Sequence, residues 1–204
     1  MDKLSKEYVI SFYNNTLQLH GDRPEAVRWS SAGQAEHYRH LLDIDKSIHK
    51  TNILDYGCGK GDFYQFLKKK NIPVQYTGFD INDGLISLAK KKYPECTFKV
   101  FDIENDTLKE DYDYIFLCGV FNLKVQGLQE TIENTLKKLF YHCRIAMAFN
   151  GLSDHDPKKT FELNYISPEK LLNFAVKNLS PYVSLQHNRI PYDFTLFIYR
   201  KTIK

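Results

Sequence analysis

A glycine-rich segment directly after a short apolar stretch places the strongest limit on what this chain can fold into. Residues 53–62 read Ile-Leu-Asp-Tyr-Gly-Cys-Gly-Lys-Gly-Asp, and a helical pattern follows them. Glycine lets the backbone turn tightly and lets a ligand approach with no Cβ in the way. The following helix would offer free N–H groups at its first turn. The segment therefore predicts a strand, a ligand-binding loop and a helix in succession.

From residue 51 onward, short apolar stretches alternate with helical patterns, as they do in a βαβ series. We expect strands at 52–56, 74–80, 97–101, 112–118 and 142–149, and helices at 62–70, 83–92, 126–140 and 168–178. The last two apolar stretches, 182–188 and 194–200, are too close together for a helix between them, so they should pair antiparallel. The pattern predicts an α/β fold with a Rossmann-like, doubly wound, seven-stranded sheet, mostly parallel with an antiparallel C-terminal hairpin.

The first 50 residues have a different character. They are helical, polar and aromatic, with a break at residues 21–24, and they contain Trp29, the single tryptophan of the chain. They are too few to form an independent core. We therefore expect two parts, a helical N-terminal appendage at 1–50 that acts as a lid, and a ligand-binding domain at 51–204.

Composition restricts the setting and the partners. The net charge is only +3, and the four cysteines are scattered without a CxxC pair. Such cysteines suit a reducing compartment. No apolar stretch is long enough for a signal peptide or a membrane span. We expect a cytoplasmic protein with no membrane association. A nucleic-acid partner is disfavoured, since nucleic-acid binders concentrate basic charge.

Two acidic residues follow successive predicted strands. Asp80 ends the second strand, about 20 residues beyond the glycines, where a carboxylate can bind both hydroxyls of a ribose. Asp102 follows the third strand and is placed to accept a hydrogen bond from an exocyclic amine. Each has a simpler explanation: Asp80 could cap a helix, Asp102 could stabilise a turn, and the glycines could form a tight turn. The combined spacing favours a nucleoside ligand.

The glycine spacing distinguishes between nucleoside ligands. The chain reads G-x-G-x-G, and Asp62 stands where the dinucleotide fingerprint needs its third glycine. Asp62 would repel a pyrophosphate but would tolerate a cationic sulfonium, which disfavours an NAD-dependent dehydrogenase. A P-loop is excluded because no G-K-[ST] follows.

Residues 55–61 resemble the first motif of the class I S-adenosylmethionine-dependent methyltransferases, and the resemblance extends from about residue 52 to 201. It implies that S-adenosylmethionine is the cofactor. By the same resemblance, Gly57 and Gly59 would lie under its methionine part and Ile81 would pack on its adenine. The residues implied to bind the cofactor are Asp55, Gly57, Cys58, Gly59, Asp80, Ile81, Asp102, Ile103, Cys118 and Gly119.

The acceptor is less constrained. Residues 116–122 lack the Asn/Asp-Pro-Pro-aromatic motif of enzymes that methylate base amines or glutamine, and Cys118 stands where metal-dependent O-methyltransferases place an acid. We therefore predict no metal site, and we interpret the acids around His155 as solvated loop residues. His155, after the fifth strand, is the candidate general base. Trp29, Phe121 and Asn150 are the candidate acceptor-binding residues.

The expected function is methyl transfer from S-adenosylmethionine to an oxygen or nitrogen of a small-molecule acceptor. One alternative is RNA methylation, to which the small net charge gives little support. Another is a non-catalytic, methyltransferase-like binding module. That alternative predicts a damaged cofactor motif, whereas the glycines, Asp80 and Asp102 are all present.

Overall fold

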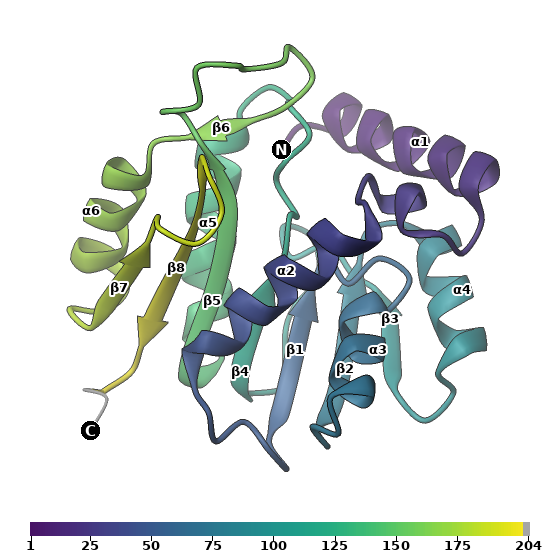
Figure 1. Ribbon diagram of the computed structural model, residues 1–204, viewed down its shortest axis with the longest axis horizontal. Helices are drawn as coiled ribbons and strands as arrows, with labels where there is room; N and C mark the ends of the chain where they lie inside the picture. The colour runs from purple at the N-terminus through teal and green to yellow at the C-terminus, as the bar shows by residue number, and fades with distance from the viewer. Residues whose placement is uncertain (202–204) are drawn as a thin grey trace.

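The computed structural model describes residues 1–201, which form one mixed sheet flanked by helices (Figure 1). The strand order is β3-β2-β1-β4-β5-β8-β7, and a short strand, β6, pairs with the end of β5. The strands are β1 (Asn52–Tyr56), β2 (Gln75–Asp80), β3 (Thr97–Val100), β4 (Tyr112–Leu117), β5 (Cys143–Ser153), β6 (Tyr165–Ile166), β7 (Val183–Gln186) and β8 (Asp193–Tyr199). β8 is antiparallel to both of its neighbours, β5 and β7, and the other pairs are parallel.

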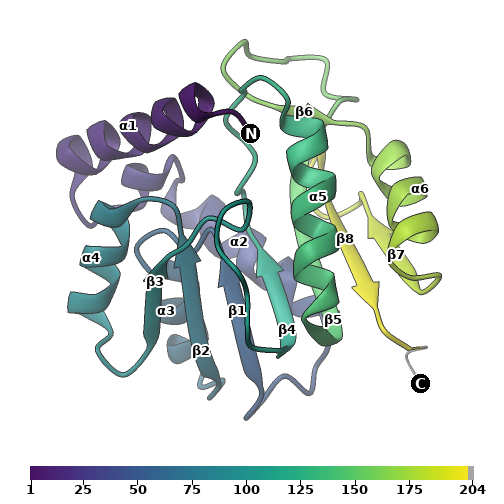
Figure 2. The ribbon, with the colours of Figure 1, turned by 180° about the vertical axis from the view of Figure 1, so that it is seen from behind.

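The helices divide between the two faces of the sheet (Figures 1 and 2). The α-helices are α1 (Lys3–His20), α2 (Ser31–Leu41), α3 (Asp62–Lys69), α4 (Asp83–Lys92), α5 (Leu128–Tyr141) and α6 (Pro168–Asn178), with 3-10 turns η1 (Pro24–Val27) and η2 (Leu42–Ile44). α2, α3 and α4 pack on one face, and α5 and α6 pack on the other. No helix among the described residues combines the length and the apolar character needed to cross a membrane.

The period-2 geometry of the strands separates the interior into two cores. Leu54 and Ile115 point to the core under α5 and α6, whereas their neighbours Ile53 and Tyr114 point to the core under α2, α3 and α4. Successive side chains of a strand face opposite sides. A strand covered on both faces must be apolar throughout, and this explains the uninterrupted apolar stretches in the sequence.

Helix α1 lies apart from both cores, across the C-terminal ends of the parallel strands (Figure 1). Asp2 caps its first turn by accepting from the Ser5 N–H at 2.8 Å, and Gly21 ends it with φ +60°. None of its residues is fully buried. Contacts with η1, α4 and the strand ends therefore hold this helix in place.

The predicted fold class is confirmed, with two local differences. β5 continues to Ser153, whereas we expected it to end at residue 149, because Asn150-Gly151 is a turn signal. Those two residues instead pair with Thr195 and Phe194 of β8. The second difference is β6, whose two residues are too few to show a period. As a consequence, the loop after β5 begins four residues later than expected.

Candidate functional site

A cavity lies between α1 and the C-terminal ends of β1, β2, β3 and β4. This edge of an open α/β sheet is where such folds bind ligands. Nine of the ten residues expected to bind the cofactor line the cavity; Asp55 does not. The nine are Gly57, Cys58, Gly59, Asp80, Ile81, Asp102, Ile103, Cys118 and Gly119.

The glycine loop needs its glycines for conformation and for space. Gly57 and Gly59 have φ values of +77° and +53°, and a Cβ on Gly57 would lie 2.5 Å from Cγ2 of Val120. Side-chain-bearing residues rarely adopt such φ values. The N–H groups of Gly57 and Cys58 donate to the Phe79 carbonyl at 2.7 and 3.0 Å, which fixes the loop to β2. The loop is thus tied to β2, and at Gly57 and Gly59 the floor that it gives the cavity carries no side chain.

Asp80, the last residue of β2, holds this floor from the other side. Its Oδ2 accepts from the Gly59 N–H at 2.8 Å, and its Oδ1 accepts from the Asn82 N–H at 2.9 Å. The N-cap of α4 is Asn82, so Asp80 is not the helix cap. Burial raises the pKa of Asp80, while these N–H donors oppose the rise. A carboxylate has about four acceptor sites, so capacity remains for two hydroxyl donors.

Asp102 has both a turn role and an ion-pair role. Its Oδ1 accepts from the Glu104 N–H at 3.0 Å, and the Lys6 ammonium lies 2.6 Å from Asp102 and 2.6 Å from Glu104. Burial alone would raise the pKa of Asp102, but Lys6 and the N–H donor outweigh it and hold that pKa below its usual value. Sequence reasoning missed Lys6. The signal was the spacing of Lys6, Val9, Ile10 and Tyr13, which places them on one face of α1, the face that lines the cavity.

Asp55 lies behind the glycine loop. It is buried and accepts a hydrogen bond from the Tyr76 hydroxyl. Burial raises the pKa of Asp55 to about 7, against the lowering effect of Tyr76. Asp55 therefore contacts Tyr76 behind the glycine loop, and it does not line the cavity in which a ligand would bind.

Asp62 is not the free charge assumed in the sequence argument against a pyrophosphate. The Lys60 ammonium, only 2% exposed, lies 2.7 and 2.6 Å from its two carboxylate oxygens. Gln34 of α2 donates to Asp62 at 3.0 Å. This correction weakens repulsion as a criterion for the ligand. It also identifies a polar link between residues 1–50 and the start of α3.

Residues 1–50 contribute part of the lining of the cavity. Tyr13, Val27, Trp29, Gln34 and Tyr38 all line it. The Trp29 indole packs on the end of β4: its Cζ2 is 2.8 Å from where a Cβ on Gly119 would be. That the segment excludes water and contacts an acceptor stays a prediction.

The candidate acceptor residues are placed differently from one another. Phe121 and Trp29 line the cavity. Asn150 does not; it is 3% exposed, and its Oδ1 accepts from the Gly119 N–H at 2.7 Å, so it supports the end of β4. Sequence position could not distinguish a residue that faces the ligand from one that supports the loop beneath it.

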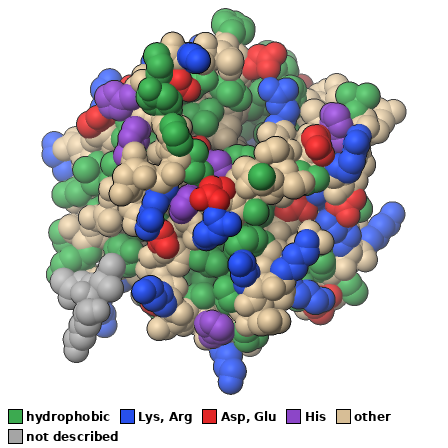
Figure 3. All heavy atoms as spheres, in the orientation of Figure 1, with side chains coloured by type: hydrophobic (Ala, Val, Ile, Leu, Met, Phe, Trp, Pro, Cys, Tyr) green, Lys and Arg blue, Asp and Glu red, His purple; other side chains and the backbone are tan. Residues whose placement is uncertain are grey.

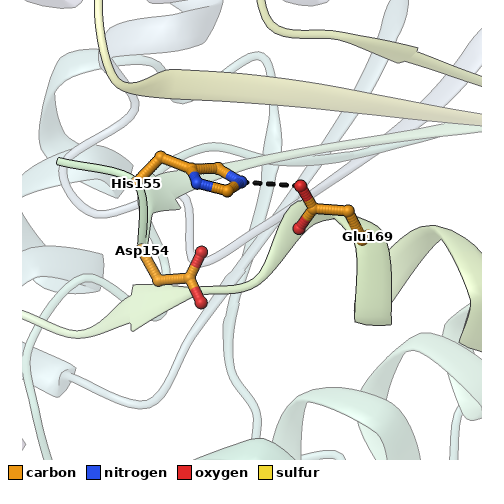
Figure 4. A group of neighbouring side chains, drawn as sticks. All are labelled: Asp154, His155 and Glu169. Atoms are coloured by element: carbon orange, nitrogen blue, oxygen red, sulfur yellow. Dashed lines mark hydrogen bonds and ion pairs between the residues drawn. The ribbon is translucent and has the colours of Figure 1, made fainter.

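His155 is not brought to the cavity. The four extra residues of β5 carry it to an exposed loop, where its Nε2 is 2.6 Å from Oε1 of Glu169 (Figure 4). This bond raises the pKa of His155. The geometry gives a general-base role no support. Asp154 lies beside the pair, with its ligand atoms within 4.8 Å of theirs. We interpret these three residues as an exposed ion pair between His155 and Glu169, with Asp154 beside it.

Comparison with known proteins agrees with this site. A family described as "Methyltransferase domain" matches residues 53–142. A protein named as a methyltransferase in Invertebrate iridescent virus 6 is 29% identical over 145 residues, which are 66% of this chain and 55% of that protein. Another, from Mycobacterium tuberculosis, is 27% identical over 163 residues, 77% of this chain and 98% of that protein. The chain thus spans about half the length of the viral relative and nearly all of the bacterial one.

A solved structure shows the same fold. The magnesium protoporphyrin IX methyltransferase of Synechocystis, with bound SAH, superimposes with a TM-score of 0.69 at 15% identity, covering 98% of this chain and all of that one. The residues present here fit an S-adenosyl ligand, since a side-chain-free floor at Gly57 and Gly59 lies beside Asp80 and Asp102. The chain is thus similar to methyltransferases over residues 53–142, and it has the fold of a solved methyltransferase that binds SAH.

Proposed function

We propose that this protein transfers the methyl group of S-adenosylmethionine to an oxygen or nitrogen atom of a small-molecule acceptor. The observation that carries the proposal is the composition of the cavity lining outside the glycine loop. Apolar and aromatic side chains gather there: Val9, Ile10, Tyr13, Trp29 and Phe121. A pocket of mostly apolar lining with a few polar groups is typical of small-molecule sites.

The cofactor, when bound, supplies an already activated methyl group, so the protein has to bind and orient the reactants. We assign the ribose to Asp80, the adenine amine to Asp102 and the methionine part to Gly57 and Gly59. Ile81 and Ile103 would pack on the adenine. The aromatic side chains of Tyr13, Trp29 and Phe121 suit a sulfonium cation, which is attracted to ring faces.

Residues 1–50 complete the site as a lid in this proposal. They close the cavity from the side opposite the strand ends, and such segments exclude water and complete acceptor pockets in many enzymes. Asn150 is assigned to support the end of β4. Trp29 and Phe121 keep their assignment as acceptor-binding residues.

Charge supports a small acceptor over RNA. On the face shown in Figure 3, basic side chains are interspersed with acidic ones. The net charge of the chain is only +3. RNA binding draws on neutralised phosphates, which requires concentrated basic charge.

Transfer of a labelled methyl group tests the proposal. The protein is incubated with S-adenosylmethionine labelled in its methyl carbon, once with a low-molecular-weight cell extract and once with total RNA. We expect label in the small-molecule fraction and a strong reduction with Asp80→Asn. Label in the RNA alone would contradict the proposal, and so would an absence of transfer in both reactions.

A further inference from the structure

The indole of Trp29 lies against the backbone of Gly119, just after β4. Gly119 has φ +66°, and Trp29 Cζ2 and Cε2 lie 2.8 and 3.5 Å from where its Cβ would be. Trp29 precedes Ser30, the N-cap of α2, which accepts from the Gly33 N–H at 3.1 Å. The side chain therefore extends from the start of α2 onto the end of β4.

His37, two turns along α2, packs against the Trp29 indole. The ring centroids of Trp29 and His37 are 4.4 Å apart, with an angle of 55° between the planes. Both imidazole nitrogens face oxygens: Nδ1 lies 2.7 Å from the Gly33 carbonyl, and Nε2 lies 2.6 Å from Oδ2 of Asp193. A carbonyl and an ionised carboxylate only accept hydrogen bonds, so both nitrogens donate and the ring is an imidazolium.

Asp193 ties this imidazolium to the sheet. It is the first residue of β8 and pairs with Leu152 of β5. The His37 and Asp193 side chains are only 9% and 11% exposed. Gln34, one turn before His37, is tied to Asp62 at 3.0 Å. Two buried polar contacts thus attach the same helix to the C-terminal strand and to the start of α3.

We infer that His37 is a positioning residue, which Asp193 and the Gly33 carbonyl hold in place so that it fixes the plane of Trp29 over Gly119. The inference rests on the proposed function, because that function makes Trp29 a wall of the acceptor pocket. Neither His37 nor Asp193 lines the cavity, so they act through Trp29. Breaking a buried ion pair leaves an uncompensated charge. The folded state therefore favours the arrangement in which His37 and Asp193 stay paired.

The charges around His37 set its protonation. Burial alone would lower the pKa of His37, but the hydrogen bond and charge of Asp193, the Gly33 carbonyl and the charge of Glu36 outweigh it and raise that pKa. Glu36 itself pairs with Arg39 and with His40. His37 therefore loses its proton at a higher pH than an ordinary histidine does.

Intrinsic fluorescence tests the inference, because Trp29 is the single tryptophan of the chain. An imidazolium in contact with an indole quenches its emission more than a neutral imidazole does. Emission of the cofactor-free wild type should rise with pH, with a midpoint above the usual histidine pKa. Asp193→Asn should lower the midpoint by roughly one to three pH units, since it removes an adjacent opposite charge. His37→Gln should abolish the transition.

Two further variants separate positioning from a general loss of structure. His37→Arg retains a cation toward Asp193, so Trp29 should keep the wild-type emission maximum and lose its pH dependence. His142→Gln is the matched control, since His142 also pairs with a carboxylate, Asp111, at 3.0 Å but contacts Tyr141. The Trp29 emission of the His142→Gln variant should change with pH as that of the wild type does. Wild-type emission that does not change with pH, or a transition that persists in His37→Gln, would overturn the inference.

S-adenosylhomocysteine binding by calorimetry keeps the two proposals distinguishable. We expect His37→Gln to bind it as the wild type does, because neither partner of the pair touches the cavity. If the wild type itself does not bind S-adenosylhomocysteine, the proposed function is wrong, whereas the fluorescence result still stands. Loss in His37→Gln alone would assign the pair to the cofactor and overturn its assignment to the Trp29 wall.

Discussion

At the scale of single residues, Asp80 connects the glycine loop to the second strand and retains capacity for a ligand. Asp80→Asn keeps the size of the side chain but removes its charge. Hydrogen bonds to a charged group contribute about 1.5–3 kcal/mol, so we expect the affinity for S-adenosylhomocysteine to fall at least about tenfold. Calorimetry measures it. Asp83→Asn, an exposed acid in the first turn of α4, is the control and should bind normally.

Asp55 gives a prediction of pH dependence. Its pKa is raised by burial to about 7, so the proton stabilises the folded state at low pH, and that stabilisation is lost as the pH rises from the usual carboxyl range through about 7. Asp55→Asn removes the charge. Relative to the wild type, the variant should gain about 2–4 kcal/mol of unfolding free energy between about pH 5 and about pH 8. Urea unfolding at both pH values measures it, and an equal difference at both would contradict the assignment.

At the scale of elements, α1 is held over the cavity by surface contacts. Lys6 pairs with Asp102 and Glu104, and the Met1 ammonium, just before the helix, also pairs with Glu104. Charged hydrogen bonds of this kind contribute about 1.5–3 kcal/mol. Lys6→Met should therefore raise hydrogen exchange in α1 by roughly tenfold, as mass spectrometry of its peptides would show. Lys3→Met is the control, since Lys3 is 89% exposed and its contact with Glu7 is long, 3.8 Å. Equal exchange in both variants would mean that the ion pairs do not hold the helix.

At the scale of the whole molecule, a ligand that binds only the folded protein stabilises it by mass action. At a ligand concentration about 100 times Kd the gain is about 2.7 kcal/mol. For a domain of this size, that corresponds to roughly 5–10 °C in Tm. S-adenosylhomocysteine should produce this shift in a thermal melt and NAD should not. A rise in Tm with NAD but not with S-adenosylhomocysteine would contradict the cofactor assignment.

The order of the elements could be predicted because it depends on local patterns. Buried parallel strands are apolar throughout, and the glycine loop needs positive φ at fixed positions, so both appear directly in the sequence. The end of β5 could not be predicted. Asn150-Gly151 signals a turn, but pairing with β8, more than 40 residues away, overrides it. That single extension also moved His155 away from the cavity.

The sequence by itself determined the fold class and the residues at the strand ends, because both follow from spacing along a few adjacent residues, and its resemblance to a known family implied the cofactor. Only the tertiary structure decided which polar groups meet. Lys6 with Asp102, Gln34 with Asp62 and His37 with Asp193 are separated by 28 to 156 residues. Such contacts depend on how α1 and α2 pack on the finished sheet, and packing joins distant segments without leaving a period or a motif in the chain.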